Sequence, residues 1–300
     1  MTHIFLTGAT GFIGKELRPL LLRDQYELTV LTRSPGKYRS EQAGNQKFVS
    51  WEDDWQEDLA KSDAVINLSG ASLFGQRWTP AVKKRIYDSR VLSTRSLVNE
   101  MAKMDNPPSV LISASAVGYY GDTGDKWIYE DRDSGLGFLA EVCKDWESEA
   151  NQAELYGVRV VIPRIGIALE YDGGAIEQMK LPFNLMGGGS IGSGKQYVPW
   201  IHRTDLCRSI KFALENGHFQ GPYNASAPEP VTMDDFAGAL GRAMHRPSWL
   251  KVPEFALKLA LGEAATPVLQ SNRAYPAKLL DQGFGFEYED IQAALNDIMR

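Results

Sequence analysis

The sequence predicts an α/β protein of Rossmann type, with a doubly wound parallel sheet and a smaller C-terminal substrate lobe. Two observations predict this class. Short apolar strands alternate with helices through the first half of the chain, and a glycine-rich turn joins the first strand to the first helix. After residue 165 glycines, prolines and short helices dominate. We therefore expect a dinucleotide-binding domain over residues 1–165 and a smaller lobe over 166–300 that is interleaved with it.

The expected elements follow one another as strand and helix. Strands are predicted at residues 3–7, 27–32, 47–50, 64–68, 110–113 and 159–163. The fourth is continuously apolar, as a buried parallel strand should be. Helices are predicted at residues 15–23, 80–104 and 138–155. Right-handed crossovers place the carboxyl ends of the strands, and with them a ligand, at one edge of the sheet.

The turn after the first strand reads as a dinucleotide site. In its G-x-x-G-x-x-G pattern, Gly8 lets the chain leave the strand sharply, Gly11 lets backbone approach a pyrophosphate, and Gly14 lets the helix pack closely. The helix N-terminus then offers free N–H groups to the phosphates. The loop residues expected to bind the cofactor are Gly8, Thr10, Gly11, Phe12, Ile13 and Gly14.

The end of the second strand indicates which dinucleotide binds. An NAD site usually has an acidic residue here for the ribose 2′-hydroxyl, whereas this chain has Arg33, which suits a 2′-phosphate. Ser34 could add a hydrogen bond and Lys37 a positive charge. We therefore expect NADP(H) as the cofactor.

The amino-acid composition excludes several classes of protein. A net charge of −6 without a basic run argues against nucleic-acid binding. Two cysteines and four histidines favour neither a disulfide framework nor a metal site. Neither a signal peptide nor a membrane span is visible, so a cytoplasmic protein without membrane attachment is expected.

With these features, the chain resembles the extended short-chain dehydrogenase/reductase superfamily of nucleotide-sugar epimerases and dehydratases. Within it, the resemblance is strongest to an atypical epimerase-family branch with bacterial members. The resemblance covers nearly the whole length. The segments that carry it are residues 8–14, 67–71 (NLSGA), 77–79 (RWT), 113–121 (SASAVGYYG), 172–174 (DGG), 200–202 (WIH) and 221–224 (GPYN).

The resemblance implies further cofactor contacts at the ends of later strands. Leu68, Ser69 and Gly70 would face the adenosine–ribose region, Ser113 and Ser115 would lie beside the nicotinamide, and Arg164 would flank its carboxamide. It also implies a small-molecule substrate, for example a nucleotide sugar. The helices expected at 80–104 and 138–155 are candidates for a homodimer interface, as in relatives.

Catalysis is where the chain departs from the superfamily pattern of serine, tyrosine and a lysine four residues later. Counting the usual spacing from Ser115 places the tyrosine position at Ala140 and the lysine position at Lys144. The predicted catalytic set is therefore Ser115, Lys144 and a substitute proton donor, for which we select Tyr119; Tyr120, Glu130 and Glu141 are alternatives.

Two functions remain open from the sequence. The first is an NADP(H)-binding oxidoreductase or epimerase-like protein that acts on a small substrate. The second is a catalytically impaired NADP(H)-binding regulatory or scaffold protein, which Ala140 at the acid–base position would explain.

Overall fold

The computed structural model describes residues 2–42 and 44–300, and its centre is a parallel sheet. The strands lie in the order β12-β8-β5-β4-β1-β2-β3, and the short β6 pairs with β8. Every pairing is parallel. The strands are β1 His3–Thr7, β2 Glu27–Thr32, β3 Gln46–Ser50, β4 Ala64–Asn67, β5 Val110–Ser113, β6 Ser115–Ala116, β8 Arg159–Ile165 and β12 Gly221–Ala225. The strand order reverses at β1, which confirms the predicted Rossmann-type fold and places its ligand-binding edge.

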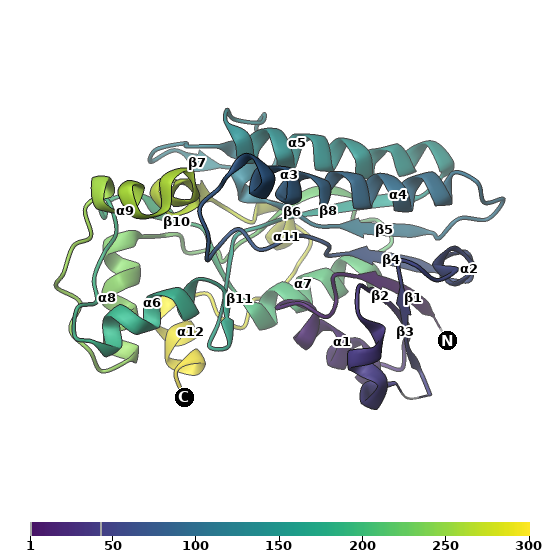
Figure 1. Cartoon of the computed structure of the whole chain (residues 1–300), viewed down its shortest axis with the longest axis horizontal. Helices are drawn as coiled ribbons and strands as arrows, with labels where there is room; N and C mark the ends of the chain where they lie inside the picture. The colour runs from purple at the N-terminus through teal and green to yellow at the C-terminus, as the bar shows by residue number, and fades with distance from the viewer. Residues whose placement is uncertain (1, 43) are drawn as a thin grey trace.

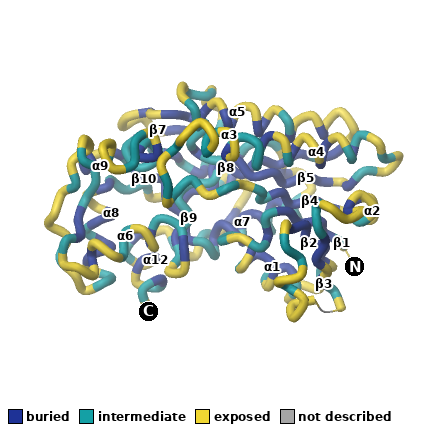
Figure 2. The backbone as a smooth tube through the Cα atoms, in the orientation of Figure 1, coloured by how far each residue is buried: buried dark blue, intermediate teal, exposed yellow. Residues whose placement is uncertain are grey.

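Helices cover both faces of this sheet, as Figure 1 shows. α1 (Gly14–Arg23) and α7 (Arg203–Glu215) pack on one face, and α4 (Val91–Met101) and α5 (Phe138–Asn151) pack on the other. Along β1, Ile4 and Leu6 join the first core and Phe5 joins the second, because side chains alternate across a strand. In Figure 2 the sheet is buried and the outer turns of the helices are exposed.

A second lobe adjoins the carboxyl edge of the sheet. Its core includes Phe183, Trp200, Phe236, Leu240 and Leu295. The elements of this lobe are β9 Ile167–Glu170, α6 Gly174–Asn184, β10 Tyr197–Val198, β11 Trp200–His202, β13 Val231–Thr232, α8 Met233–Ala243, α9 Glu254–Leu261, α10 Thr266–Leu269 and α12 Ile291–Ile298. Between these segments the chain returns to the central sheet, to which it contributes α7 and β12.

The remaining elements are short. They are η1 Pro35–Glu41, α2 Trp55–Ala60, η2 Val117–Tyr120, β7 Trp127–Ile128, η3 Gln152–Tyr156, η4 Gly262–Ala265, β14 Arg273–Ala274 and α11 Ala277–Asp281. Within the described ranges, no helix is long and apolar enough to cross a membrane.

The helix predicted over residues 80–104 is two helices, α3 (Pro80–Asp88) and α4. The break lies at Ser89 and Arg90. The carbonyl of Ile86 accepts hydrogen bonds from the side chains of both residues, while the Arg90 amide bonds to the carbonyl of Tyr87 instead. Ser89 Oγ also accepts from the amide of Ala71, 2.9 Å away. The break therefore ties the start of α4 to the loop after β4.

Two other boundaries differ from prediction. The helix predicted over 138–155 ends as α5 at Asn151 and continues as η3. The strand predicted to end at Pro163 continues to Ile165, because β12 and β6 offer it pairing partners that the sequence does not reveal. Arg164, expected in the loop after this strand, therefore lies inside β8.

Candidate functional site

A cavity of about 830 Å³ opens at the carboxyl ends of the central strands. It reaches from the end of β2, across the glycine loop after β1, to the end of β5 and the face of α5. The sequence-predicted site residues that line it are Gly8, Thr10, Gly11, Phe12, Ile13, Arg33, Leu68, Ser69, Gly70 and Ser115. The predicted site residues that do not line it are Gly14, Ser34, Lys37, Ser113, Tyr119, Lys144 and Arg164.

The glycine loop has the geometry of a phosphate cradle. Gly8 has φ +67°, and a Cβ there would collide with the carbonyl of Leu68. The amide of Gly11 donates to the Gly8 carbonyl at 3.0 Å and closes the turn. In the described part of the chain, the amides of Phe12 and Ile13 donate to no backbone carbonyl. Free amides at the N-terminus of α1 fit the pyrophosphate of a dinucleotide.

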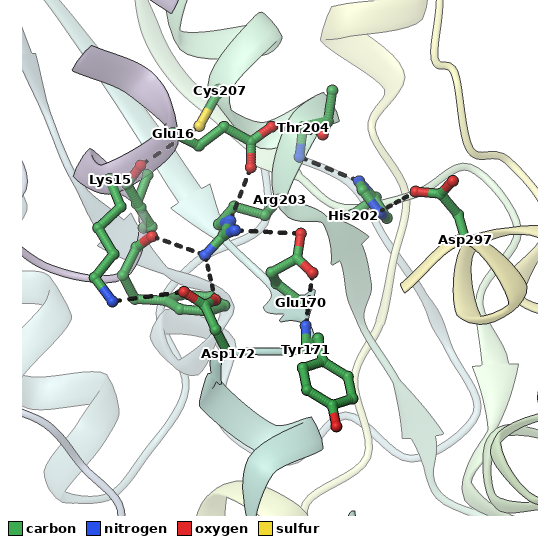
Figure 3. A network of polar contacts seen from close by, with 12 residues as sticks. Lys15, Glu16, Glu170, Tyr171, Asp172, His202, Arg203, Thr204, Cys207 and Asp297 are labelled. Carbon is green, nitrogen blue, oxygen red and sulfur yellow. Dashed lines mark hydrogen bonds and ion pairs between the residues drawn. The ribbon is translucent and has the colours of Figure 1, made fainter. Parts of the chain in front are cut away.

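Arg203, at the start of α7 and directly after β11 of the second lobe, supports this loop (Figure 3). Its guanidinium donates to Glu16 of α1 at 2.8 Å and to Asp172 at 2.6 Å, and it pairs with Glu170 at 3.3 Å. It also lies 4.9 Å from the ring centre of Phe12. Three carboxylates thus fix a cation against the loop and join the two parts of the fold.

The rim at the end of β2 carries an exposed cation. Arg33 lines the cavity and forms no salt bridge with any residue in the described ranges. Trp51, just after β3, also lines the cavity, and its ring lies 5.4 Å from that of Trp55. The sequence analysis missed Trp51, because only the pairing of β3 with β2 brings it beside Arg33.

A buried polar network forms the floor beneath the cavity. The side chain of Asn67 accepts from Thr7 Oγ1 at 2.6 Å and donates to Thr94 Oγ1 at 2.7 Å and to Ser113 Oγ at 3.1 Å. These bonds tie the ends of β1, β4 and β5 to α4. Ser113 is therefore held below the cavity surface.

Ser115 joins the cavity to a buried ion pair. Its hydroxyl donates to Glu147 of α5 at 2.6 Å, and Glu147 accepts two hydrogen bonds from Arg164, both 2.9 Å long. Burial alone would lower the pKa of Arg164, but the hydrogen bonds and charge of Glu147 raise it above its ordinary value. Arg164 is thus a fully paired structural cation behind Ser115.

The four substitute proton donors suggested by the sequence do not line the cavity. The Tyr119 ring packs on Arg164, whose guanidinium carbon lies 3.7 Å from the ring centre. Glu141 is exposed on α5. Tyr120 is buried, which raises its pKa, and it donates to Asn224 at 2.7 Å. Burial likewise raises the pKa of Glu130, which accepts from the amides of Asn224 and Lys278.

The assignment of Ala140 and Lys144 needs a correction of one residue. The α5 residues that line the large cavity are Leu139, Val142, Cys143 and Trp146, which lie on one helix face. Lys144 is exposed, and Ala140 borders a neighbouring cavity of about 160 Å³. The cavity-facing pair four residues apart is therefore Leu139 and Cys143. Counting from Ser115 missed it because a count along the chain does not fix the rotation of α5, which decides which residues face the cavity.

The thiol of Cys143 is a titratable group that lines the cavity together with Ser115. Burial is the largest of the effects that raise its pKa to about 11, and the charge of Glu147 adds to it. The charge of Arg90, the Ala116 amide and the nearby Ser115 hydroxyl act in the opposite direction. Cys143 is therefore a neutral thiol near neutral pH and a poor substitute for a lysine cation.

The fold and the cavity define an NAD(P)-binding protein of Rossmann type. The model of the NAD dependent epimerase/dehydratase family matches residues 4–137, and a domain of unknown function (DUF1731) matches residues 252–298. An Arabidopsis thaliana protein, "Epimerase family protein SDR39U1 homolog, chloroplastic", is 41% identical over 99% of this chain and 86% of its own length. "Epimerase family protein YfhF" of Bacillus subtilis is 38% identical over 99% of this chain and 98% of its own.

Solved structures agree with this grouping. Human epimerase family protein SDR39U1 (isoform 2), crystallised with NADPH, has a TM-score of 0.86 and 29% identity, and the match covers 99% of both chains. UDP-glucuronic acid 4-epimerase from Bacillus cereus, solved with NAD, has a TM-score of 0.78 but 17% identity, over 99% of both chains, and shows the fold alone. The chain belongs to the NAD dependent epimerase/dehydratase family, in the extended short-chain dehydrogenase/reductase superfamily.

Proposed function

We propose that this protein binds NADP(H) and acts as an oxidoreductase or epimerase-like enzyme on a small substrate beside Ser115. One observation carries the proposal: a single cavity connects the free cation at the end of β2, the open amides of the glycine loop and the Ser115 hydroxyl. Its volume of about 830 Å³ is in the range of a pocket for a cofactor and a small ligand.

Arg33 supports NADP(H) over NAD(H). The position offers a guanidinium where an NAD site offers a carboxylate, and this guanidinium has no acidic partner among residues 2–42 and 44–300. An arginine fork binds phosphate through paired, charge-assisted hydrogen bonds. The similar human protein was crystallised with NADPH, which is consistent with this choice.

Different residues of the chain would then bind the cofactor and the substrate. The amides of Phe12 and Ile13 hold the pyrophosphate. Trp51 lines the cavity beside Arg33. When bound, the nicotinamide supplies or accepts a hydride. Because Ser115 donates its proton to Glu147, its oxygen lone pairs are free to accept a hydrogen bond from a substrate hydroxyl.

A second function is favoured by the face of α5. Leu139 and Cys143 offer neither the phenol nor the cation of the superfamily's tyrosine–lysine pattern, so NADP(H) could be bound without rapid turnover. Such a protein would sense or carry the cofactor. A screen of carbonyl compounds, alcohols and nucleotide sugars separates the two functions, because redox cycling of NADP(H) requires the first.

The variant Leu139→Tyr/Cys143→Lys sharpens that screen. If the site lacks only an acid–base pair, this variant gains turnover with a substrate on which the wild type is slow. If the wild type is an efficient enzyme, the same change reduces turnover, because the new side chains fill the substrate's space.

Arg33→Ala tests the cofactor assignment. Loss of a charge-assisted contact costs about 1.5–3 kcal/mol, so we expect NADPH to bind roughly 10- to 150-fold more weakly. NADH, which has no 2′-phosphate, should bind as it does to the wild type. Fluorescence titration measures both.

The control for this test is Arg39→Ala, an exposed arginine of η1 that does not line the cavity. It should leave both affinities unchanged. Equal weakening of NADPH and NADH by Arg33→Ala would exclude the 2′-phosphate role.

A further inference from the structure

Arg90, at the break between α3 and α4, places an uncompensated cation inside the cavity. The guanidinium is held firmly: Nη1 donates to the Ile86 carbonyl at 3.1 Å and Nη2 donates to the Ala71 carbonyl at 3.0 Å. It also lies 5.5 Å from the ring centre of Trp146. All these partners are neutral.

The charge of Arg90 is not offset by protein. In the described part of the chain, no carboxylate lies within 4.0 Å of its guanidinium, and Nε has no hydrogen-bond partner. Burial lowers its pKa, which reports the cost of keeping this cation away from water. By contrast, Arg164 and Arg203, two arginines that lie behind the cavity, pair with one and three carboxylates. A half-buried cation that is oriented but unpaired is suited to bind an anionic ligand group.

The position of Arg90 separates this group from the cofactor phosphates assigned above. The pyrophosphate has the amides of Phe12 and Ile13, and the 2′-phosphate has Arg33. Arg90 instead lies on the α5 side, where its guanidinium is 5.5 Å from the ring centre of Trp146, and it lines the same cavity as Cys143 and Ser115. We propose that Arg90 binds the acid group of the substrate, a carboxylate or phosphoryl group, while Ser115 accepts a hydrogen bond from its hydroxyl group.

This inference rests on the proposed function and names its substrate class: a small hydroxy or carbonyl compound that bears an oxyanion. Arginine suits such a group because its planar fork matches the two oxygens of a carboxylate or phosphate. Gly70 makes room for the Arg90 guanidinium, since a Cβ there would lie 3.1 Å from Arg90 Cζ.

The test measures anion binding to the full-length protein saturated with NADPH, so that the cofactor phosphates already occupy their own sites. Oxalate and inorganic phosphate are titrated by calorimetry. We expect the wild type to bind at least one of them saturably and Arg90→Gln to bind it roughly 10- to 100-fold more weakly. Arg90→Lys keeps the charge and should retain more affinity than Arg90→Gln.

The matched control is Arg95→Gln on the same helix. Arg95 pairs with Glu149 at 2.6 Å outside the cavity, so its loss changes the net charge equally but should leave anion binding unchanged. Thermal unfolding of each ligand-free variant verifies that it is folded. If Arg90→Gln does not fold, Arg90→Lys replaces it in the anion titration.

Three results overturn the inference. The NADPH-saturated wild type binds neither anion, Arg90→Gln binds them as Arg95→Gln does, or Arg90→Gln weakens NADPH itself by the same factor. The last result would assign Arg90 to the cofactor pyrophosphate. Failure of the wild type to bind NADPH at all would instead remove the proposed function, and this inference with it.

Discussion

At the scale of single residues, the glycines of the cofactor loop have different structural roles. A Cβ at Gly14 would collide with the backbone of Ala9, whereas a Cβ at Gly11 would lie 3.1 Å from the Gly8 carbonyl and beside the cavity. Gly14 is therefore needed for packing, and Gly11 is needed mainly for the ligand.

Alanine substitutions should separate these roles. Gly14→Ala should lower the free energy of unfolding by about 1–3 kcal/mol through overpacking. Gly11→Ala should unfold near the wild-type temperature but bind NADPH much more weakly, because its methyl group occupies space needed by the pyrophosphate. Thermal unfolding and NADPH titration check both, and equal loss of stability in the two variants would refute the distinction.

The sequence predicted the loop residues and Arg33 because their spacing is local to one strand and one turn. It could not predict Arg90, Trp51 or Cys143 as cavity residues, because the pairing of distant strands and the exact rotation of α5 bring them there. For the same reason it placed the α5 pair one residue too late.

At the scale of elements, a buried ion pair joins α5 to β8 behind the site. Arg164 and Glu147 have side chains that are 4% and 8% exposed, so removal of one partner leaves a buried charge unpaired. The pair also holds Ser115, so the stability of this contact and the geometry of the site are linked.

Glu147→Gln should therefore destabilise the fold by about 3–5 kcal/mol. Glu149→Gln, two residues along the same helix, breaks a partly exposed pair with Arg95 and should cost only about 0–1 kcal/mol. Urea unfolding of both variants measures the difference. A loss no larger for Glu147→Gln than for Glu149→Gln would show that the buried pair is not needed for stability.

His202, at the junction of β11 and α7, should make stability depend on pH (Figure 3). Burial lowers its pKa and outweighs the carboxylates that raise it, those of Glu170, Asp205, Asp297 and Glu16. Nδ1 accepts from the Thr204 amide, so the neutral ring is the form that fits. The unfolded chain therefore binds the proton more readily than the folded one.

This difference in the pKa of His202 between the folded and unfolded chain sets the direction of the pH dependence. Below the unfolded pKa of about 6.5, stability should fall as pH falls toward the lower folded pKa. His202→Gln should flatten the slope of stability between pH 7 and pH 5, and His218→Gln, at an exposed position, is the control. Urea unfolding across this range checks it, and an unchanged slope in His202→Gln would contradict it.

At the scale of the whole molecule, the order of strands and helices was predictable because hydrophobic periodicity reports it directly. The break at Ser89 and Arg90 was not, since side chains competing for the Ile86 carbonyl cause it and periodicity does not register them. The return of the chain to the sheet at β12 was also missed, because Gly221–Ala225 has little strand character of its own.

A homodimer through the outer faces of α4 and α5 stays a prediction. The two helices pack side by side and cover one face of the sheet, so a second copy could continue that layer. Sedimentation at several protein concentrations would measure the oligomeric state.

The central claim is that the cavity at the strand ends is an NADP(H) site. Titration of the purified protein with NADPH and with NADH, by fluorescence and thermal unfolding, tests it most directly. We expect saturable NADPH binding that is tighter than that of NADH and that stabilises the fold by about 2.7 kcal/mol at one hundred times the dissociation constant. Binding of neither nucleotide, or tighter binding of NADH, would contradict the account.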